Sequence, residues 1–147
     1  GPNDSRFGPR FPPVNPIYDK ELQDSLHQTA ISLGLGSIMR RGCYCGVSGP
    51  SYETPHEIEM MRTLGGHAVG MSTVFELIDA AHCSIPIVGI SLISNRCKGP
   101  KDDFVNPTHK EVLDSVSSRA GDVLRLVEAF VDRIDLSDRE RPPAFTH

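Results

Sequence analysis

Three polar side chains occupy positions where predicted strands end, and their types together could do chemistry. They are Glu53, Ser72 and Asn95. Ligands of an open parallel sheet bind outside the carboxyl ends of its strands, so we expect these residues to gather at one edge. The large side chains of Tyr52 and Met71 stand beside them in the sequence. A carboxylate, a hydroxyl, an amide and two broad apolar surfaces can hold a flat ring that carries hydrogen-bonding atoms.

The elements that must position these residues alternate between strand and helix. Strands are predicted at Tyr44–Ser48, Ala68–Met71 and Ile85–Ser94, with helices between them at Pro55–Leu64 and Val74–Ala81. This alternation implies right-handed crossovers, so the fold class is α/β, with helices flanking a mixed, mostly parallel sheet. The run Ile85–Ile93 is nearly all apolar, which is typical of a strand that is buried on both faces.

Two further helices and three helix starts complete the predicted framework. Apolar residues at helical spacing predict helices at Tyr18–Leu33 and at His109–Ile134. Three segments carry the threonine and glutamate of a capping box, in which each side chain bonds the backbone N–H of the other residue. These segments are Thr54–Glu57, Thr73–Glu76 and Thr108–Glu111. Residues 1–135 are predicted to belong to one domain, and residues 136–147 to form a disordered tail.

The composition argues against several classes of protein. The chain has 147 residues, enough for a single core, and its net charge of −4 with scattered basic residues argues against nucleic-acid binding. The longest apolar run is interrupted by proline and glycine and is too short to span a bilayer. The four cysteines fit no zinc-site spacing, and no metal is predicted. We expect reduced thiols, as in a cytoplasmic protein, with Cys43 and Cys45 facing opposite sides of a strand.

Each candidate residue also has an interpretation without chemistry. Glu53 precedes a helix start, where the helix dipole favours a carboxylate whatever its function. Asn95 can be a turn former, and Met71 and Tyr52 can be ordinary core residues. His109, at the first position of the last predicted helix, can be an ordinary exposed histidine. From the residue types alone these alternatives stay open.

Three motifs in this order resemble the trimeric purine nucleoside phosphorylases. They are Gly49-Pro50-Ser51-Tyr52-Glu53-Thr54, Ala68-Val69-Gly70-Met71-Ser72-Thr73-Val74 and Ser91-Leu92-Ile93-Ser94-Asn95. The opening of the chain and the segment Thr108–Leu113 resemble the same family, so the resemblance covers nearly everything except the tail. It implies a homotrimeric α/β enzyme of purine salvage that needs no cofactor. With inorganic phosphate as co-substrate, such an enzyme splits a purine nucleoside into the free base and ribose 1-phosphate.

The resemblance also implies a role for each site residue. Glu53 would accept a hydrogen bond from purine N1–H, and Asn95 would donate to O6 or N7, where negative charge builds as the glycosidic bond breaks. Adenine has a lone pair at N1 that repels a carboxylate, so this pair favours 6-oxopurine nucleosides such as inosine and guanosine. The other implied roles fall to Tyr44 and Met71 at the sugar, His109 at its 5′-hydroxyl, Tyr52 and Val69 at the base, and Ser72 at phosphate.

The chain departs from the family because the N-terminal half of the family's fold has no counterpart in it. In the family that half supplies a glycine-rich phosphate loop and further phosphate donors, whereas this chain offers phosphate only Ser72. Strands are absent too, so we expect the apolar face of Ile85–Ile93 to be exposed. We interpret the chain as the C-terminal half of a nucleoside phosphorylase. Two alternatives are a non-catalytic purine-binding or oligomerising remnant and, less favoured, a hydrolase that uses water.

Overall fold

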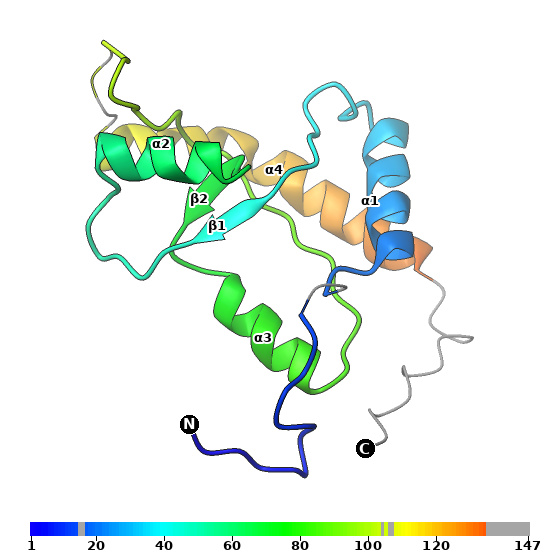
Figure 1. Ribbon diagram of the computed structural model, residues 1–147. Coiled ribbons are helices and arrows are strands. Elements are labelled where there is room, and N and C mark those ends of the chain that lie inside the picture. Colours follow the sequence, from blue (N-terminus) through cyan, green and yellow to red (C-terminus); the bar gives the residue numbers. More distant parts are fainter. Residues whose placement is uncertain (15–16, 104, 106–107, 135–147) are drawn as a thin grey trace. The chain divides into compact units, whose positions relative to one another are not determined.

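The computed structural model describes residues 1–14, 17–103, 105 and 108–134 of the chain, which contain four helices and two strands (Figure 1). In chain order these elements are α1 (Lys20–Ser32), β1 (Tyr44–Gly46), α2 (Pro55–Thr63), β2 (Ala68–Gly70), α3 (Val74–His82) and α4 (His109–Arg133). The four predicted helices are confirmed, with ends that shift by one or two residues. None of these helices is both long enough and apolar enough to cross a membrane.

The chain divides into two compact units. The first unit comprises residues 1–37, 73–90 and the chain from residue 126 onward, and the second unit comprises residues 38–72 and 91–125. Helix α4 therefore contributes its first part to the second unit and its last part to the first. The prediction that residues 1–135 form one domain stays a prediction, and the predicted tail at residues 136–147 lies outside the described residues.

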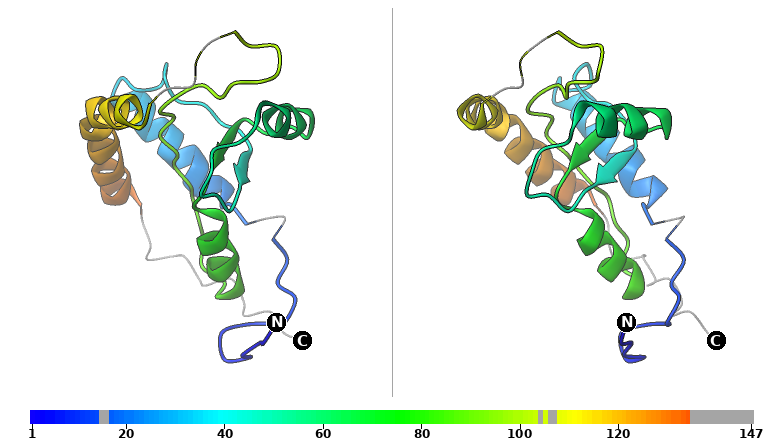
Figure 2. Two further views of the ribbon diagram at one scale, coloured as in Figure 1. Left: turned by 90° about the vertical axis from the view of Figure 1, so that its left-hand side faces the viewer. Right: turned by 60° about the vertical axis from the view of Figure 1, so that its left-hand side comes forward.

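The second unit is built on a short parallel pair of strands. Strand β1 pairs with β2 so that Tyr44 lies opposite Ala68 and Gly46 opposite Gly70. The ladder continues beyond both ends, because the backbone N–H of Val47 donates to Gly70 over 2.9 Å. Helix α2 lies beside the two strands in every view (Figure 2). The predicted α/β class is confirmed, with a sheet of two strands in the described part of the chain.

The third predicted strand, Ile85–Ser94, is wrong for this chain. Within the described residues only Ile87 of that run pairs, through an isolated parallel bridge to Tyr18. Ile85 is 56% exposed and Ile93 is 64% exposed, so the run is not buried on both faces. A strand needs a neighbour for its backbone groups, and none lies along Ser91–Ser94 in the described part of the chain. The expectation that the missing neighbours leave this apolar run exposed is confirmed.

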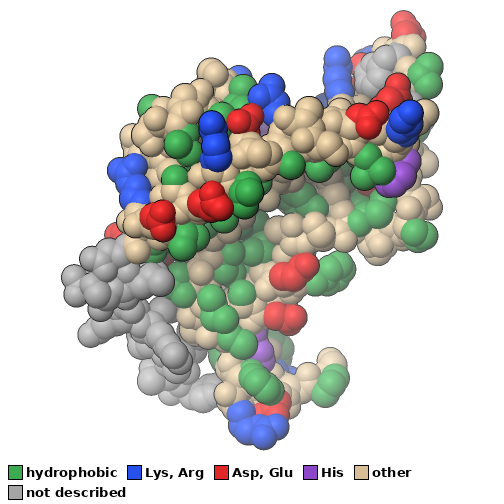
Figure 3. Space-filling view, turned by 180° about the vertical axis from the view of Figure 1, so that it is seen from behind, with side chains coloured by type: hydrophobic (Ala, Val, Ile, Leu, Met, Phe, Trp, Pro, Cys, Tyr) green, Lys and Arg blue, Asp and Glu red, His purple; other side chains and the backbone are tan. Residues whose placement is uncertain are grey.

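The buried apolar residues are unevenly distributed between the two units. Seven of the eight lie in the first unit, from α1, α3, α4 and the loop after α1: Leu22, Leu26, Ala30, Leu35, Leu77, Leu126 and Phe130. Among the described residues of the second unit, Ile58 of α2 alone is a buried hydrophobic residue. Hydrophobic side chains are correspondingly visible at the surface in Figure 3. The second unit therefore has little core of its own, which is unusual for a unit of its length.

Two of the three predicted capping boxes are confirmed. At the start of α2 the backbone N–H of Thr54 donates to the Glu57 carboxylate over 2.7 Å, and Glu57 N–H donates to the Thr54 hydroxyl over 3.3 Å. Thr108 and Glu111 form the same pair of bonds at the start of α4. The predicted box at Thr73 is wrong, because Thr73 has φ of 73° and its side chain makes no cap bond. A β-branched residue in this conformation is strained.

The prediction that Cys43 and Cys45 face opposite ways is also wrong. The two residues stand two positions apart along an extended segment, and such residues share one face. Burial raises the pKa of the Cys45 thiol, and the charge of Cys43 and a hydrogen bond with the Cys43 side chain raise it further. All four cysteines are free thiols.

The first testable prediction concerns the start of α2. Replacing Thr54→Ala removes one partner of the capping box and should lower the free energy of unfolding by about 1 kcal/mol. Urea unfolding of the chain measures the loss. The matched control is Thr63→Ala at the end of the same helix, whose hydroxyl bonds a carbonyl within the helix. That change should be neutral or slightly stabilising, because alanine is the better helix former.

The same box also gives stability that depends on pH. Hydrogen bonds from the Thr54 backbone N–H, and secondly from its hydroxyl, lower the pKa of Glu57 below its ordinary value of 4.5. A carboxyl whose pKa is lowered by folding stabilises the fold above its ordinary pKa, and this stabilisation is lost as pH falls through the lowered value. In Thr54→Ala the pKa of Glu57 should rise only part of the way, because the backbone bond remains. An unchanged pKa in an NMR titration would contradict this account.

Candidate functional site

The structure brings Glu53 and Asn95 to one small pocket in the second unit. Glu53 comes from the loop before α2, and Asn95 follows the segment that starts at Ser91. The pocket is lined by Tyr52, Glu53, Ile58, Asn95, Cys97, Lys98 and Val112. One concave surface therefore holds three residues that were predicted to recognise one flat ring: Tyr52, Glu53 and Asn95. Asn95 lies more than forty positions after the other two in the chain.

Glu53 also acts on the thiol of Cys97, which lines the same pocket. The pKa of the Cys97 thiol is raised, first by burial and second by the negative charge of Glu53, while the positive charge of Arg62 opposes the increase. A carboxylate acts on a neighbouring thiol in this way only at short range. Glu53 is half-buried and lines the pocket, in surroundings that strengthen hydrogen bonds.

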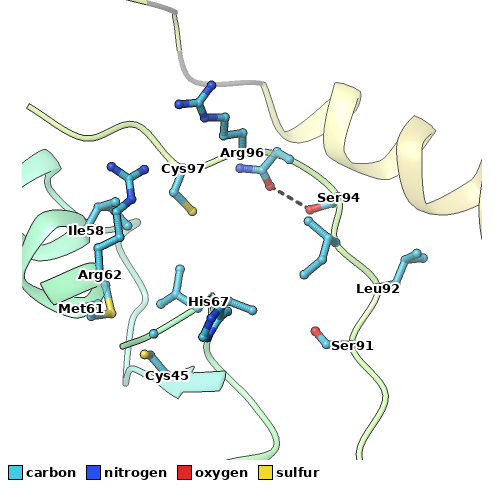
Figure 4. Close-up of a pocket in the computed structure, with 15 residues that line it drawn as sticks. Cys45, Ile58, Met61, Arg62, His67, Ser91, Leu92, Ser94, Arg96 and Cys97 are labelled. Carbon is cyan, nitrogen blue, oxygen red and sulfur yellow. Dashed lines mark hydrogen bonds between the residues drawn. The ribbon is translucent and has the colours of Figure 1, made fainter. Parts of the chain in front are cut away.

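The amide of Asn95 is held in one orientation by its neighbour. The Ser94 hydroxyl donates to Asn95 Oδ1 over 2.8 Å, at a half-buried position (Figure 4). With its oxygen used in this bond, the amide presents Nδ2, which carries two donors. A donor is the group that an acceptor atom at a ring edge requires. Ser94 was not predicted as a site residue, although it stands directly before Asn95 in one of the three motifs.

Two of the predicted residues, Tyr44 for the sugar and Ser72 for phosphate, meet beyond the carboxyl end of β2, although Tyr44 is the first residue of β1. The Tyr44 hydroxyl lies 3.5 Å from Ser72 Oγ and accepts from the Ser72 backbone N–H over 3.4 Å. The Tyr44 ring reaches this place across Gly70, where a side chain would collide with the Tyr44 hydroxyl. Two hydroxyl groups thus lie together where a polar ligand could bind.

Met71 lies beside the turn that precedes Glu53. Gly49 has φ of 63°, and a side chain at this position would collide with Met71 Sδ. Glycine is needed at position 49 both for the conformation of the turn and for this close approach. Met71 is 38% exposed and presents an apolar surface at the end of β2.

Val69 and Asn95 line a second, larger cavity of about 530 Å³ in the same unit. This large cavity also contains Ile58 and Cys97, which it shares with the small pocket. His109 lines neither of them: it is exposed at the first position of α4, one turn before Val112 of the small pocket. His109 therefore lies near the site. Among the described residues, no contact joins it to Glu53 or Asn95.

Asp102 ties the loop after Asn95 to α2, and the sequence did not point to it. Its carboxylate accepts from Gly99 N–H over 2.7 Å and from Arg96 over 3.2 Å, and it lies 3.9 Å from the guanidinium of Arg62 on α2. The Asp102 side chain is only 19% exposed, so this is not a fully solvated contact. The tie links the loop that follows Asn95 to the helix that Glu53 precedes. An aspartate after Gly-Pro-Lys is a turn signal that could have suggested it.

No group of three or more histidine, cysteine, aspartate or glutamate side chains that could hold a metal ion occurs in the part of the chain that the structure describes. The donors at Ser72 and Tyr44 are neutral hydroxyls. Binding an anion such as phosphate away from water requires several donors, and charged ones are the strongest. The arrangement suits a neutral ring and a sugar better than it suits phosphate.

Comparison with known proteins decides the family. Residues 1–132 match the family described as the phosphorylase superfamily. The chain belongs to this superfamily. It is 45% identical to purine nucleoside phosphorylase 1 of Geobacillus stearothermophilus over 89% of this chain and 46% of the relative. It is 37% identical to the purine nucleoside phosphorylase of Mus musculus over 95% of this chain and 48% of that relative.

Solved structures agree with the sequence comparison. The structure of Schistosoma purine nucleoside phosphorylase in complex with hypoxanthine superimposes with a TM-score of 0.88 at 35% identity. It matches 92% of this chain and 48% of that one. The predicted resemblance to the purine nucleoside phosphorylases and the predicted fold class are therefore confirmed. The chain spans about half the length of the relatives that it matches.

The second testable prediction concerns the tie at Asp102. Replacing Asp102→Asn removes the charge that faces Arg62 and Arg96 and should loosen the loop that carries Cys97. We expect iodoacetamide to label Cys97 about 2- to 10-fold faster, which corresponds to the loss of roughly 0.5–1.5 kcal/mol of hydrogen bonding. Mass spectrometry of the labelled peptides measures the rate for each cysteine.

The matched control is Asp103→Asn, an exposed neighbour. It should leave the labelling rate of Cys97 unchanged, and the rate of Cys83, which lies in the first unit, should stay constant in both variants. Equal rates for Cys97 in the two aspartate variants would show that Asp102 does not hold the loop.

Proposed function

We propose that the protein from which this chain comes catalyses phosphorolysis of 6-oxopurine nucleosides, and that this chain provides the purine and ribose half of the site. The products would be the free purine base and ribose 1-phosphate. The observation that carries the proposal is the meeting of Glu53 and Asn95 in one small pocket, with the Asn95 amide turned so that its NH₂ group is available. The superfamily membership supports the same conclusion.

The chemistry of this pair accounts for the choice of purine. A 6-oxopurine carries a hydrogen at N1, which the Glu53 carboxylate can accept, and oxygen and nitrogen acceptors at O6 and N7, toward which Asn95 can donate. Negative charge builds on the purine as its bond to ribose breaks, so a donor at these atoms stabilises the transition state more than the ground state. Adenine offers a lone pair at N1 instead, which a carboxylate repels.

In this proposal the remaining predicted residues serve the sugar, the base and phosphate. Met71 would present its apolar surface to the ribose, and Tyr44 would reach a ribose hydroxyl. Tyr52 would flank the base in the small pocket, Val69 would reach it from the large cavity that shares Asn95 with that pocket, and His109 would contact the 5′-hydroxyl. Ser72 contributes one hydroxyl to phosphate. In this proposal no metal or organic cofactor takes part, since phosphate itself is the nucleophile.

Ligand complexes of related proteins fit this substrate class. Schistosoma purine nucleoside phosphorylase has been crystallised in complex with inosine and with guanosine, and also with adenosine. A second isoform from the same organism has been crystallised with ribose 1-phosphate. These complexes belong to those proteins. For this chain they support a nucleoside site, while the preference for 6-oxopurines depends on Glu53 and Asn95.

Phosphate binding in this proposal requires polypeptide beyond this chain. The chain spans about half the length of its relatives, and Ser72 and Tyr44 alone are too few donors to hold an anion. We propose that the other half supplies the phosphate donors and that the complete protein is a cytoplasmic homotrimer. The second candidate function is a non-catalytic, purine-binding or oligomerising role, and the shortage of phosphate donors in this chain favours it for the chain in isolation.

Inosine loss with and without phosphate is the test that separates these two functions. The assay uses this chain alone and this chain produced together with the unmatched half of the Geobacillus relative. Turnover that depends on both phosphate and the added half supports the phosphorylase. Hypoxanthine binding to the chain without turnover in either case would favour the non-catalytic purine-binding role. The absence of both binding and turnover would refute the phosphorylase and the purine-binding role and leave the oligomerising one.

The third testable prediction concerns the base. In Asn95→Asp a carboxylate replaces the amide and can accept from the amino group of adenine. The ratio of hypoxanthine to adenine affinity should therefore fall by about 10- to 100-fold, equivalent to roughly 1.5–3 kcal/mol for a hydrogen bond that involves a charged group. Calorimetric titration of both bases measures the ratio. The matched control is Asn3→Asp at an exposed position in the first unit, which should not alter it. An unchanged ratio in Asn95→Asp would contradict the role of Asn95.

The fourth testable prediction concerns the sugar. His109→Ala should weaken binding of inosine by up to about 10-fold, the loss of one hydrogen bond to the 5′-hydroxyl. Hypoxanthine has no sugar, so its affinity should not change, and the ratio of the two affinities is the measurement. His56→Ala, in the first turn of α2 and also exposed, is the matched control. Equal effects on inosine and hypoxanthine would exclude a role of His109 at the sugar.

A further inference from the structure

Two thiols lie side by side at the start of β1. Cys43 directly precedes the strand and Cys45 is its middle residue, so the two stand two positions apart along an extended segment. Residues with this spacing share one face of a strand. The two side chains are hydrogen-bonded to each other, and both are free thiols. The proposed function uses neither of them.

The two thiols differ in their access to solvent. Cys43 is exposed, whereas Cys45 is half-buried, and a side chain at Gly66 would collide with Cys45 Sγ. Burial is the first cause that raises the pKa of the Cys45 thiol, and the charge of Cys43 and the hydrogen bond with it are the next. Cys45 therefore keeps its proton to higher pH and is the weaker nucleophile at neutral pH.

We propose that Cys43 and Cys45 form a redox-active dithiol, in which a hydroperoxide oxidises Cys43 and Cys45 then closes a disulfide across Tyr44. An accessible cysteine beside a second, resolving cysteine is the arrangement that such chemistry requires. The proposal goes beyond the proposed reaction and does not depend on it.

The two steps balance with one molecule of hydroperoxide. The Cys43 thiolate attacks one oxygen of the peroxide and the O–O bond breaks. The sulfur becomes a sulfenic acid, and the other oxygen leaves with a proton as water or as an alcohol. The Cys45 sulfur then attacks the Cys43 sulfur, the S–O bond breaks, and hydroxide leaves with the Cys45 proton as water. Two thiols lose two electrons, and the peroxide accepts them.

Closing this disulfide must distort the strand. Two residues with this spacing in a strand have Cα atoms about 6.4–6.8 Å apart, whereas most disulfides join Cα atoms roughly 5.5–6 Å apart. The bond therefore draws Cys43 toward Cys45 and bends the segment at Tyr44. A disulfide that distorts its surroundings is more easily reduced, so cellular thiols can reverse the oxidation.

The backbone of Cys43 is tied to the turn before β2, and this tie transmits the distortion. Its N–H donates to His67 Nδ1 over 3.1 Å, and its carbonyl accepts from the backbone N–H of His67 over 2.9 Å and of Ala68 over 3.1 Å. A shift of Cys43 toward Cys45 lengthens these bonds. Oxidation should therefore loosen the start of the β1–β2 pair and move Tyr44, whose hydroxyl meets Ser72.

Other partners for these thiols fit less well. Figure 4 shows Cys45 and Cys97 on different sides of the large cavity, with open space between them. Cys83 belongs to the first unit. A bound metal ion would need further donors, and the part of the chain that the structure describes contains no group of three that could hold one.

Peptide mapping after oxidation is the direct test. The chain is treated with hydrogen peroxide, alkylated with iodoacetamide in denaturant and digested with trypsin. Trypsin cleaves after Arg41 and Arg62, so one peptide carries both Cys43 and Cys45, and Cys83 falls into another. We expect this peptide to lose both alkylation sites and two hydrogens. Dithiothreitol should restore them, and Cys83 should remain alkylated.

Single variants separate the roles of the two cysteines. In Cys45→Ser the sulfenic acid on Cys43 has no resolving thiol, so dimedone should label Cys43 at least about 10-fold more than in the unchanged chain. In Cys43→Ser the remaining Cys45 should resist the same dose of peroxide. Cys83→Ser is the matched control and should leave the disulfide yield unchanged. Circular dichroism confirms that each variant keeps its helices.

Amide hydrogen exchange measures the effect on the strand pair. In the oxidised chain the amides of His67 and Ala68 should exchange about 10-fold faster or more, because their acceptor on Cys43 has moved. The amides of α1, in the first unit, serve as the reference and should not change. Exchange of His67 and Ala68 at the unchanged rate in a chain that carries the disulfide would refute the coupling to β1.

Three results would overturn the dithiol itself. The first is a Cys43 that stays at the sulfenic or sulfinic acid in the unchanged chain, without a disulfide. The second is a disulfide that joins Cys45 to Cys97. The third is a disulfide between two chains, seen as a dimer on a gel without reductant. Loss of inosine turnover bears on the proposed reaction alone, so failure of that reaction and failure of the dithiol are distinguishable.

Discussion

Parallel pairing of β1 with β2 is the constraint on which the site depends. The register sets Tyr44 opposite Ala68 and Gly46 opposite Gly70, so both strands end at one edge. The turns that follow them must leave from that edge, which brings Met71 against Gly49 and Ser72 against Tyr44. A shift of the register by one residue would turn alternate side chains to the other face and separate these contacts. The side chains of Tyr44, Met71 and Ser72 are thus positioned by backbone hydrogen bonds in which these side chains take no part.

The sequence predicted interactions between residues that are close in the chain better than interactions between distant residues. The capping boxes at Thr54 and Thr108 were predictable because both partners lie three residues apart. The same pattern failed at Thr73, whose backbone adopts a positive φ between β2 and α3. The meeting of Glu53 with Asn95 was expected at the carboxyl ends of parallel strands, but Asn95 follows no strand in the described chain, so the family motifs alone account for that prediction. The contact of Asp102 with α2 was not predictable, because a contact between a loop and a helix leaves no periodic trace in the sequence.

The failure of the strand Ile85–Ser94 has a physical explanation. Its composition is that of a buried strand, but a strand exists only where another segment accepts its hydrogen bonds, and composition does not supply that partner. Ile87 pairs because Tyr18 lies alongside it, and the part from Ser91 onward has no such neighbour in the described chain. In the second unit the composition of the run therefore predicts a strand that the tertiary structure does not form. The same unit buries the fewest hydrophobic residues.

Sharing of residues between the two cavities has a thermodynamic consequence. Asn95 and Cys97 line both the large cavity and the small pocket, so anything that orders the segment Ser91–Cys97 would lower the entropy cost of binding a ligand in the small pocket. Linkage is reciprocal, so a ligand held by Glu53 and Asn95 would favour the ordered state of this segment by the same factor. Under the proposed function, recognition of the base and ordering of Ser91–Cys97 are then two aspects of one event.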